Sequence, residues 1–162
     1  MKSLNDEIRE YRLQLQGGRI QTAYKGIMTF MSGLKSHLEK DYPGHFTSAL
    51  YFGYMDMTYF AFTPAFLKAK KLKIAIVYLH EQGRFEVWLG GTNRKIQADT
   101  IERLSHRDLG RYQLSRVHPG VDSIIESVVI EQPDFDDLEE LETQIEMKTI
   151  EFINDISSLL DE

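Results

Sequence analysis

Cysteine is absent from this chain of 162 residues, and its absence excludes several kinds of chemistry. Without a thiol there is no disulfide, no cysteine nucleophile, no iron–sulfur cluster and no zinc site built on thiolates. Long apolar runs are lacking too, because no window reaches the roughly 18 apolar residues that a membrane-spanning helix needs. The first residues are too rich in charge to resemble a signal peptide. We therefore expect a cytoplasmic protein with no membrane partner.

Sequence motifs of several active sites are missing as well. The histidines include no pair at the i, i+4 spacing of a helical metal site, and His80-Glu81 lacks the second histidine of H-E-x-x-H. No serine lies in a G-x-S-x-G motif. The glycines match neither the Walker spacing nor the dinucleotide-binding spacing. The sequence predicts no catalytic residue, no metal ion and no cofactor.

Acidic residues are concentrated at one end of the chain. The net charge is −6, yet residues 134–162 hold eleven acidic residues and one basic residue, a net charge of −10. The first 133 residues therefore carry the difference, +4. Two interpretations stay open: a solvated helix face, or an acidic element that covers a basic surface or repels nucleic acid.

Hydrophobic patterning predicts a single α+β domain over residues 1–162. With 42% apolar and 27% charged residues, the composition is that of a folded chain and not of a disordered one. The expected sheet has roughly five, mainly antiparallel strands, over residues 47–53, 57–63, 72–79, 84–89 and 123–130. Around it we expect two N-terminal helices separated by Gly17-Gly18, one middle helix over 94–106, and a long acidic C-terminal helix capped by Asp134.

Two glycines interrupt the second expected helix, which spans about residues 19–40. Gly26 and Gly33 lie seven residues apart, and each costs helix stability, up to about 1 kcal/mol. Their usual purpose is to let another backbone approach closely, so we expect such a contact here. Helices are expected to cover one face of the sheet more fully than the other.

The strands over 72–79 and 84–89 form a hairpin whose register decides which side chains share a face. A two-residue turn at Gln82-Gly83 would pair Glu81 with Arg84 and Val77 with Trp88. The core face would then carry Ile74, Ile76, Tyr78, Phe85, Val87 and Leu89. The other, mixed face would carry Ala75, Val77, Leu79, Arg84, Glu86 and Trp88. A slip of one residue would exchange these two sets.

The mixed face is the candidate binding site. A carboxylate in mid-strand, Glu86, must be paired or solvated, and Arg84 is its nearest partner. Nearby strands are rich in tyrosine, which offers rigid contact area with a polar tip. The helix start after Gly90-Gly91 adds backbone N–H groups that favour an anion. We predict a non-catalytic protein that binds a small ligand or a protein partner. The predicted site residues are Tyr51, Tyr59, Glu86, Trp88, Asn93 and Arg94.

Three other hypotheses stay open. One is nucleic-acid binding, with affinity that falls steeply as salt rises. It would use Lys68, Lys70, Lys71, Lys73, Arg94 and Lys95. Another is a hydrolase assembled from Asp56, His80 and Glu86, which no recognised catalytic spacing supports. The last is a homodimer through the long helices or an open sheet edge.

The segment LKIAIVYLHEQGRFEVWLGGTNRKIQ, residues 72–97, resembles small uncharacterised prokaryotic proteins of a domain-of-unknown-function family. That resemblance covers most of the chain and implies no activity. The order of one helix, three strands, a helix and a strand is also similar to the core of restriction-endonuclease-like folds. In that family Asp56 and Glu86 would stand for the magnesium-binding acids. Trp88 takes the place of the catalytic lysine, which implies a degenerate domain that binds nucleic acid.

Overall fold

An antiparallel sheet with the strand order β1-β2-β3-β4-β5 is the centre of the computed structural model, which describes residues 3–161. The five strands are β1 (Phe46–Thr47), β2 (Met57–Thr63), β3 (Leu72–Leu79), β4 (Arg84–Gly91) and β5 (Ser123–Ile130). The helices are α1 (Leu4–Leu15), α2 (Arg19–Asp41), α3 (Ala65–Ala69), α4 (Arg94–Leu104) and α5 (Leu138–Leu160). The predicted α+β class and single domain are confirmed.

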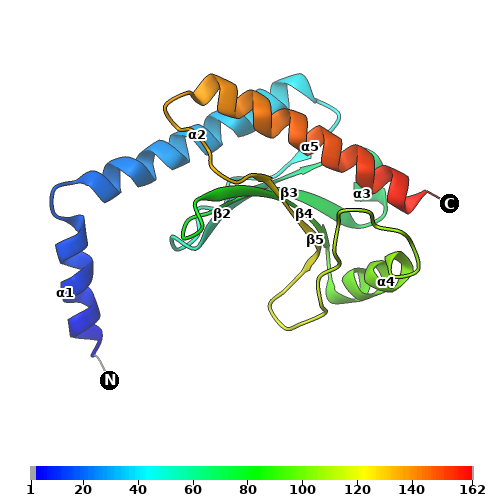
Figure 1. The fold of residues 1–162 in the computed structure, drawn as a ribbon, viewed down its shortest axis with the longest axis horizontal. Coiled ribbons are helices and arrows are strands. Elements are labelled where there is room, and N and C mark those ends of the chain that lie inside the picture. Colours follow the sequence, from blue (N-terminus) through cyan, green and yellow to red (C-terminus); the bar gives the residue numbers. More distant parts are fainter. Residues whose placement is uncertain (1–2, 162) are drawn as a thin grey trace.

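The two long helices lie across one face of the sheet. In Figure 1, α2 and α5 run above the strands, whereas α4 lies below them at the far end from α1. The hydrophobic core fills the space beneath α2 and α5, where sheet residues such as Phe60 and Ile76 meet Leu34 and Phe152. The helices therefore cover one face of the sheet more fully than the other, as the sequence predicted.

The β3–β4 hairpin has the predicted faces but not the predicted register. Leu79 pairs with Arg84 and Val77 with Glu86, two residues away from the expected pairing. Four residues instead of two make the connection, which is closed by a 2.8 Å hydrogen bond from Gly83 N–H to the Leu79 carbonyl. Because strand side chains alternate with a period of two, a two-residue shift leaves every side chain on its predicted face.

Most predicted boundaries lie within about two residues of the observed ones. Two differ by more, and polar side chains explain both. The strand expected over 47–53 shrinks to β1 and a bridge between Tyr51 and Tyr59. There the Ala61 N–H donates to the Ser48 hydroxyl, which replaces a backbone partner. Asp134 does not cap α5, because its carboxylate accepts from the Asp136 N–H in a turn. Asp137 is the cap.

The N-terminal helix stands away from the rest of the molecule. A capping box between Ser3 and Asp6 starts α1, and none of the helix's residues is buried. Figure 1 shows that the chain bends sharply between α1 and the start of α2. The close approach expected at Gly26 and Gly33 is absent, since an added Cβ would meet nothing within 4 Å at either position. No helix within residues 3–161 has the length and apolar character needed to cross a membrane.

Candidate functional site

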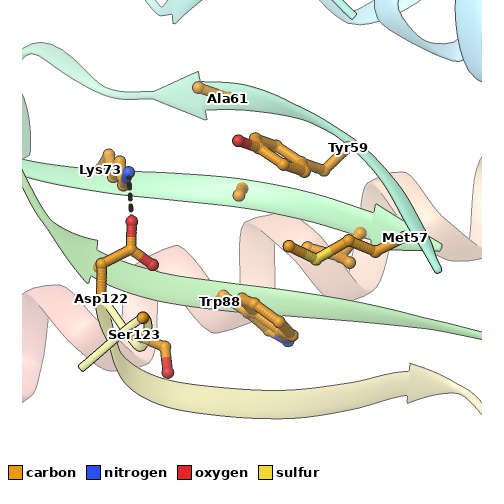
Figure 2. Close-up of a pocket in the computed structure, with 11 residues that line it drawn as sticks. Met57, Tyr59, Ala61, Lys73, Trp88, Asp122 and Ser123 are labelled. Carbon is orange, nitrogen blue, oxygen red and sulfur yellow. Dashed lines mark hydrogen bonds and ion pairs between the residues drawn. The ribbon is translucent and has the colours of Figure 1, made fainter. Parts of the chain in front are cut away.

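A cavity of about 190 Å³ lies on the sheet face opposite α2 and α5, and we call it the sheet cavity. Figure 2 shows Tyr59 and Met57 on one side of it and Trp88 on the other. Its lining consists of Met57, Tyr59, Ala61, Lys73, Ala75, Val77, Trp88, Gly90, Gly120, Asp122 and Ser123. Two of the six predicted site residues, Tyr59 and Trp88, therefore come together here.

The hollow arises from the alternation of large and small residues on three neighbouring strands. Ala61, Ala75 and Gly90 provide a low floor, because strand side chains two residues apart point to the same face. Tyr59 and Trp88 stand above this floor as walls. A Cβ at Gly90 would lie 3.2 Å from the Asp122 carbonyl and 3.2 Å from Lys73 Cε, so glycine keeps this end of the cavity clear.

Trp88 is held in place by a buried carboxylate. Its indole Nε1–H donates to Glu86 Oε1 at 2.8 Å, and Arg84 Nε donates to Glu86 Oε2 at the same distance. Glu86 is only 3% exposed. The pKa of Arg84 is raised, mainly by its hydrogen bond with Glu86. The predicted pairing of Glu86 with Arg84 is confirmed. Glu86 does not line the cavity itself; it supports Trp88, which does.

The opposite end of the cavity is charged. Lys73, near the start of β3, donates from Nζ to Asp122 Oδ2 at 2.9 Å. Figure 2 marks this ion pair with a dashed line. Next to it Ser123 is buried, and its hydroxyl donates to Glu126 Oε2 at 2.6 Å. Both charged side chains are partly exposed to solvent. A ligand with an apolar body and one polar end matches this distribution.

A second, shallower hollow adjoins the first across Tyr59. It has a volume of about 360 Å³, and its lining includes Tyr51, Phe46 and Lys68. The rings of Tyr51 and Tyr59 lie 4.9 Å apart between centroids. The predicted site residue Tyr51 thus contacts the wall of the sheet cavity from outside.

Asn93 and Arg94 lie apart from the sheet cavity, at the start of α4. The Asn93 side chain accepts a hydrogen bond from the Ile96 N–H at 2.9 Å, so it serves as the helix cap. Arg94 is exposed in the first turn of the helix. Neither residue lines the cavity beside Trp88. Their part in an anion site stays a prediction.

Two of the three groups of the proposed hydrolase are neighbours, since the His80 N–H donates to the Asp56 carbonyl at 3.0 Å, but Glu86 lies apart from them. His80 contacts Tyr24 of α2 and hydrogen-bonds with the Thr58 hydroxyl on the helix-covered face, whereas Glu86 lies on the opposite face. Asp56 precedes β2 and accepts hydrogen bonds from the Tyr54 and Met57 N–H groups. These backbone bonds are the main cause of its lowered pKa. Strand β3 lies between Asp56 and Glu86, so the two acids do not form the paired site of a nuclease either.

The basic residues of the nucleic-acid hypothesis are partly engaged with other groups. Lys73 pairs with Asp122, and Lys95 pairs with Asp99 at 2.9 Å. Lys68 Nζ lies 4.0 Å from the centre of the Phe46 ring. The remaining members of the set, Lys70, Lys71 and Arg94, are exposed. This hypothesis stays a prediction.

The fold and the sheet cavity together define a class: an α+β protein whose antiparallel sheet is covered by helices on one face and hollowed on the other. Within that class the chain belongs to the family described as domain of unknown function (DUF7000), whose model matches residues 4–160. The predicted family resemblance is thereby confirmed. Comparison with curated proteins and with solved structures found no match.

Several lining residues were missed by sequence reasoning. Met57 and Ala61 look like ordinary strand residues, and their contribution depends on the pairing of strands. Ala75 was placed on the mixed face but was not named as a site residue. Asp122 and Ser123 follow an irregular segment that the sequence does not place. Lys73 was considered only as part of a basic patch. The available signal was the run of small residues on the mixed face, at Ala61, Ala75 and Gly90.

Proposed function

We propose that this is a cytoplasmic, non-catalytic protein that binds a small molecule of about one ring in the sheet cavity. The observation that carries the proposal is the cavity itself, which joins an apolar floor, two aromatic walls and a charged end. Concave, mostly apolar pockets with a few convergent polar groups are typical of ligand sites. The absence of cysteine supports the cytoplasmic location.

The volume limits the size of the ligand. A dry cavity of about 150 Å³ holds benzene, so a cavity of about 190 Å³ suits one ring with a small substituent. A protein partner is less favoured, because stable protein interfaces bury about 800 Å² on each side and extend over a broad surface. The aromatic walls favour a planar ring that packs against Trp88 and Tyr59.

The charged end favours a polar substituent on that ring. Lys73 can hold an anionic group and Asp122 a cationic one, either beside their ion pair or by opening it. Because both side chains are partly exposed, their pairing contributes little and costs little to open. We therefore expect a charged or strongly polar substituent, and the probes below separate the two signs.

Trp88 fluorescence provides the test, since it is the only tryptophan in the chain. We would titrate benzoate, benzylamine and benzyl alcohol, which share one ring and differ in charge. We expect a saturable change in Trp88 emission that is strongest for one of the two charged probes. Tyr59→Ala should weaken that binding about three- to tenfold, because one aromatic wall is lost.

Tyr54→Ala is the matched control, because Tyr54 is 90% exposed and does not line the cavity. It should leave the affinity unchanged. Absence of a saturable signal with all three probes, or equal losses in both tyrosine variants, would contradict the proposal. Circular dichroism of each variant checks that folding is intact.

Nucleic-acid binding remains the alternative, and the same fluorescence experiment can include a short single-stranded oligonucleotide. Binding through the basic residues near Lys71 predicts an affinity that falls steeply between low and moderate salt. An affinity that is insensitive to salt, or no binding at low salt, would exclude it.

A further inference from the structure

Three side chains from two helices meet on the outer side of the molecule, away from the sheet cavity. His37 and Asp41 lie one turn apart on α2, and Glu146 faces them from α5. His37 Nε2 lies 2.6 Å from Glu146 Oε1 and 3.4 Å from Asp41 Oδ2. We call these three residues the His37 cluster. One imidazole nitrogen and two carboxylate oxygens, all within 4.8 Å of one another, form this group.

These distances suit a shared divalent ion. Zinc binds histidine nitrogen and carboxylate oxygen at about 2.0–2.2 Å, so two ligands of one ion lie about 3.0–3.5 Å apart. The separation of His37 Nε2 and Asp41 Oδ2, 3.4 Å, lies within this range. The hydrogen-bonded separation from Glu146 is 2.6 Å and has to widen by less than 1 Å, which a side-chain rotation can provide.

Groups behind the cluster orient its ligands, as partners of metal ligands do. The Tyr42 hydroxyl donates to Glu146 Oε2 at 2.8 Å, which leaves Oε1 directed at His37. Burial, and then this hydrogen bond, raise the pKa of Tyr42 to about 12, so the hydroxyl stays protonated. On the other side of the ring, His37 Nδ1 lies 3.6 Å from Glu142 Oε1. A carboxylate at Nδ1 leaves Nε2 available as the ligand atom.

The local charge also favours a cation. Three carboxylates, those of Asp41, Glu142 and Glu146, surround one imidazole. Even a protonated His37 leaves this group with excess negative charge. A divalent ion that replaces the imidazole proton would offset more of that charge.

We infer that His37, Asp41 and Glu146 form a binding site for a divalent transition-metal ion that ties α2 to α5. An imidazole ligand favours zinc over magnesium, which prefers oxygen ligands and keeps several of its waters. The sequence analysis predicted no metal ion, because the chain has no pair of histidines at i, i+4 spacing. The i, i+4 spacing of His37 and Asp41 was the available signal.

Calorimetric titration with zinc chloride tests the inference on the full, chelator-treated chain without a histidine tag. We expect one zinc ion per chain, no comparable heat with magnesium chloride, and a higher unfolding temperature with zinc. Asp41→Asn should weaken zinc binding at least about tenfold. Since Asp41 is exposed, this variant is expected to fold normally. Tyr42→Phe should weaken binding through loss of the contact that orients Glu146.

The matched control is Glu102→Gln on α4. Glu102 forms the same kind of i, i+4 pair with His106, at 3.2 Å, but within residues 3–161 no third histidine or carboxylate from another element joins that pair. It should leave zinc affinity unchanged. Failure of the chain to bind zinc, or equal losses in the Asp41 and Glu102 variants, would overturn the inference. A loss confined to the Asp41 variant supports it, and neither result bears on the sheet cavity.

Discussion

Trp88 Nε1–H donates a 2.8 Å hydrogen bond to Oε1 of Glu86, two residues earlier on the same face of β4. This contact fixes the orientation of one wall of the sheet cavity. It also explains how a carboxylate that is 3% exposed can occupy the middle of the sheet, because Arg84 satisfies its other oxygen. A structural network of three residues thus supports the surface on which binding is proposed.

Glu86→Ala should remove the support of Trp88. It leaves the indole N–H without its acceptor, so we expect the free energy of unfolding to fall by about 1–3 kcal/mol. We also expect iodide to quench Trp88 fluorescence more strongly, because the freed ring becomes more mobile. Chemical denaturation and quenching measure these two effects.

Glu131→Ala is the control for that experiment. Glu131 also pairs with Arg84, at 3.6 Å, but its side chain is 66% exposed. An exposed ion pair contributes little, so we expect a change of less than about 1 kcal/mol. Equal losses in the two variants would show that the hydrogen bond from Trp88 has no stabilising role.

The sequence determined the faces of the sheet more reliably than its edges. Alternation of apolar and polar residues placed Glu86 and Trp88 on one face, and this placement survived an error of two residues in the register because the period is two. The cap of the last helix was predicted wrongly because the local turn in which Asp134 accepts from the Asp136 N–H resembles a cap in the sequence. The end of the first strand was predicted wrongly because Ser48 accepts from Ala61, which becomes its neighbour only in the fold.

The candidate site was less predictable for the same reason. Tyr59 and Trp88 were recognised as aromatic residues on a mixed face. Asp122 was missed because its partner Lys73 is 49 residues away in the sequence. Asn93 was assigned to the site from a glycine-rich helix start; its side chain caps α4, and its part in an anion site stays a prediction. Local signals predicted the Asn93 cap, whereas the cavity depends on contacts between distant strands.

Two glycines with opposite surroundings provide a second prediction. Gly33→Ala should raise the free energy of unfolding by about 0.5–1 kcal/mol, because the helix position has open space and alanine favours helix. Gly91→Ala should lower it, because the added Cβ would lie 2.7 Å from the Gln97 backbone nitrogen. Thermal unfolding of both variants checks the signs. A stabilising Gly91→Ala would show that α4 can shift away from β4.

Removal of the N-terminal helix provides a third prediction. No residue of α1 is buried, so a chain that begins at Gly17 should unfold with nearly the same free energy as the full chain. Apolar residues such as Leu4, Ile8 and Tyr11 are nevertheless exposed on α1. Sedimentation of both chains tests the homodimer predicted from the sequence. If a dimer forms and depends on α1, the truncated chain will sediment as a monomer; a large loss of monomer stability would contradict our account of α1.

The last prediction concerns pH, with chelator present to exclude metal. The hydrogen bond to Glu146 and the charges of Glu142 and Asp41 raise the pKa of His37 above its ordinary value of 6.5. The folded state therefore holds this proton more tightly than the unfolded state. Stability from His37 is fully present below about pH 6.5, and is lost as pH rises through the folded pKa.

The measurement compares His37→Gln with the unmodified chain between about pH 5 and pH 9. We expect the difference in the free energy of unfolding to shrink as the pH rises. His45 and His80, whose pKa values are lowered by burial, oppose folding at low pH, but they are present in both proteins and cancel in the comparison. His106→Gln, which removes a highly exposed pair, should differ little from the unmodified chain. A difference for His37→Gln that stays constant with pH would mean that the neutral imidazole, through hydrogen bonding alone, holds α2 to α5.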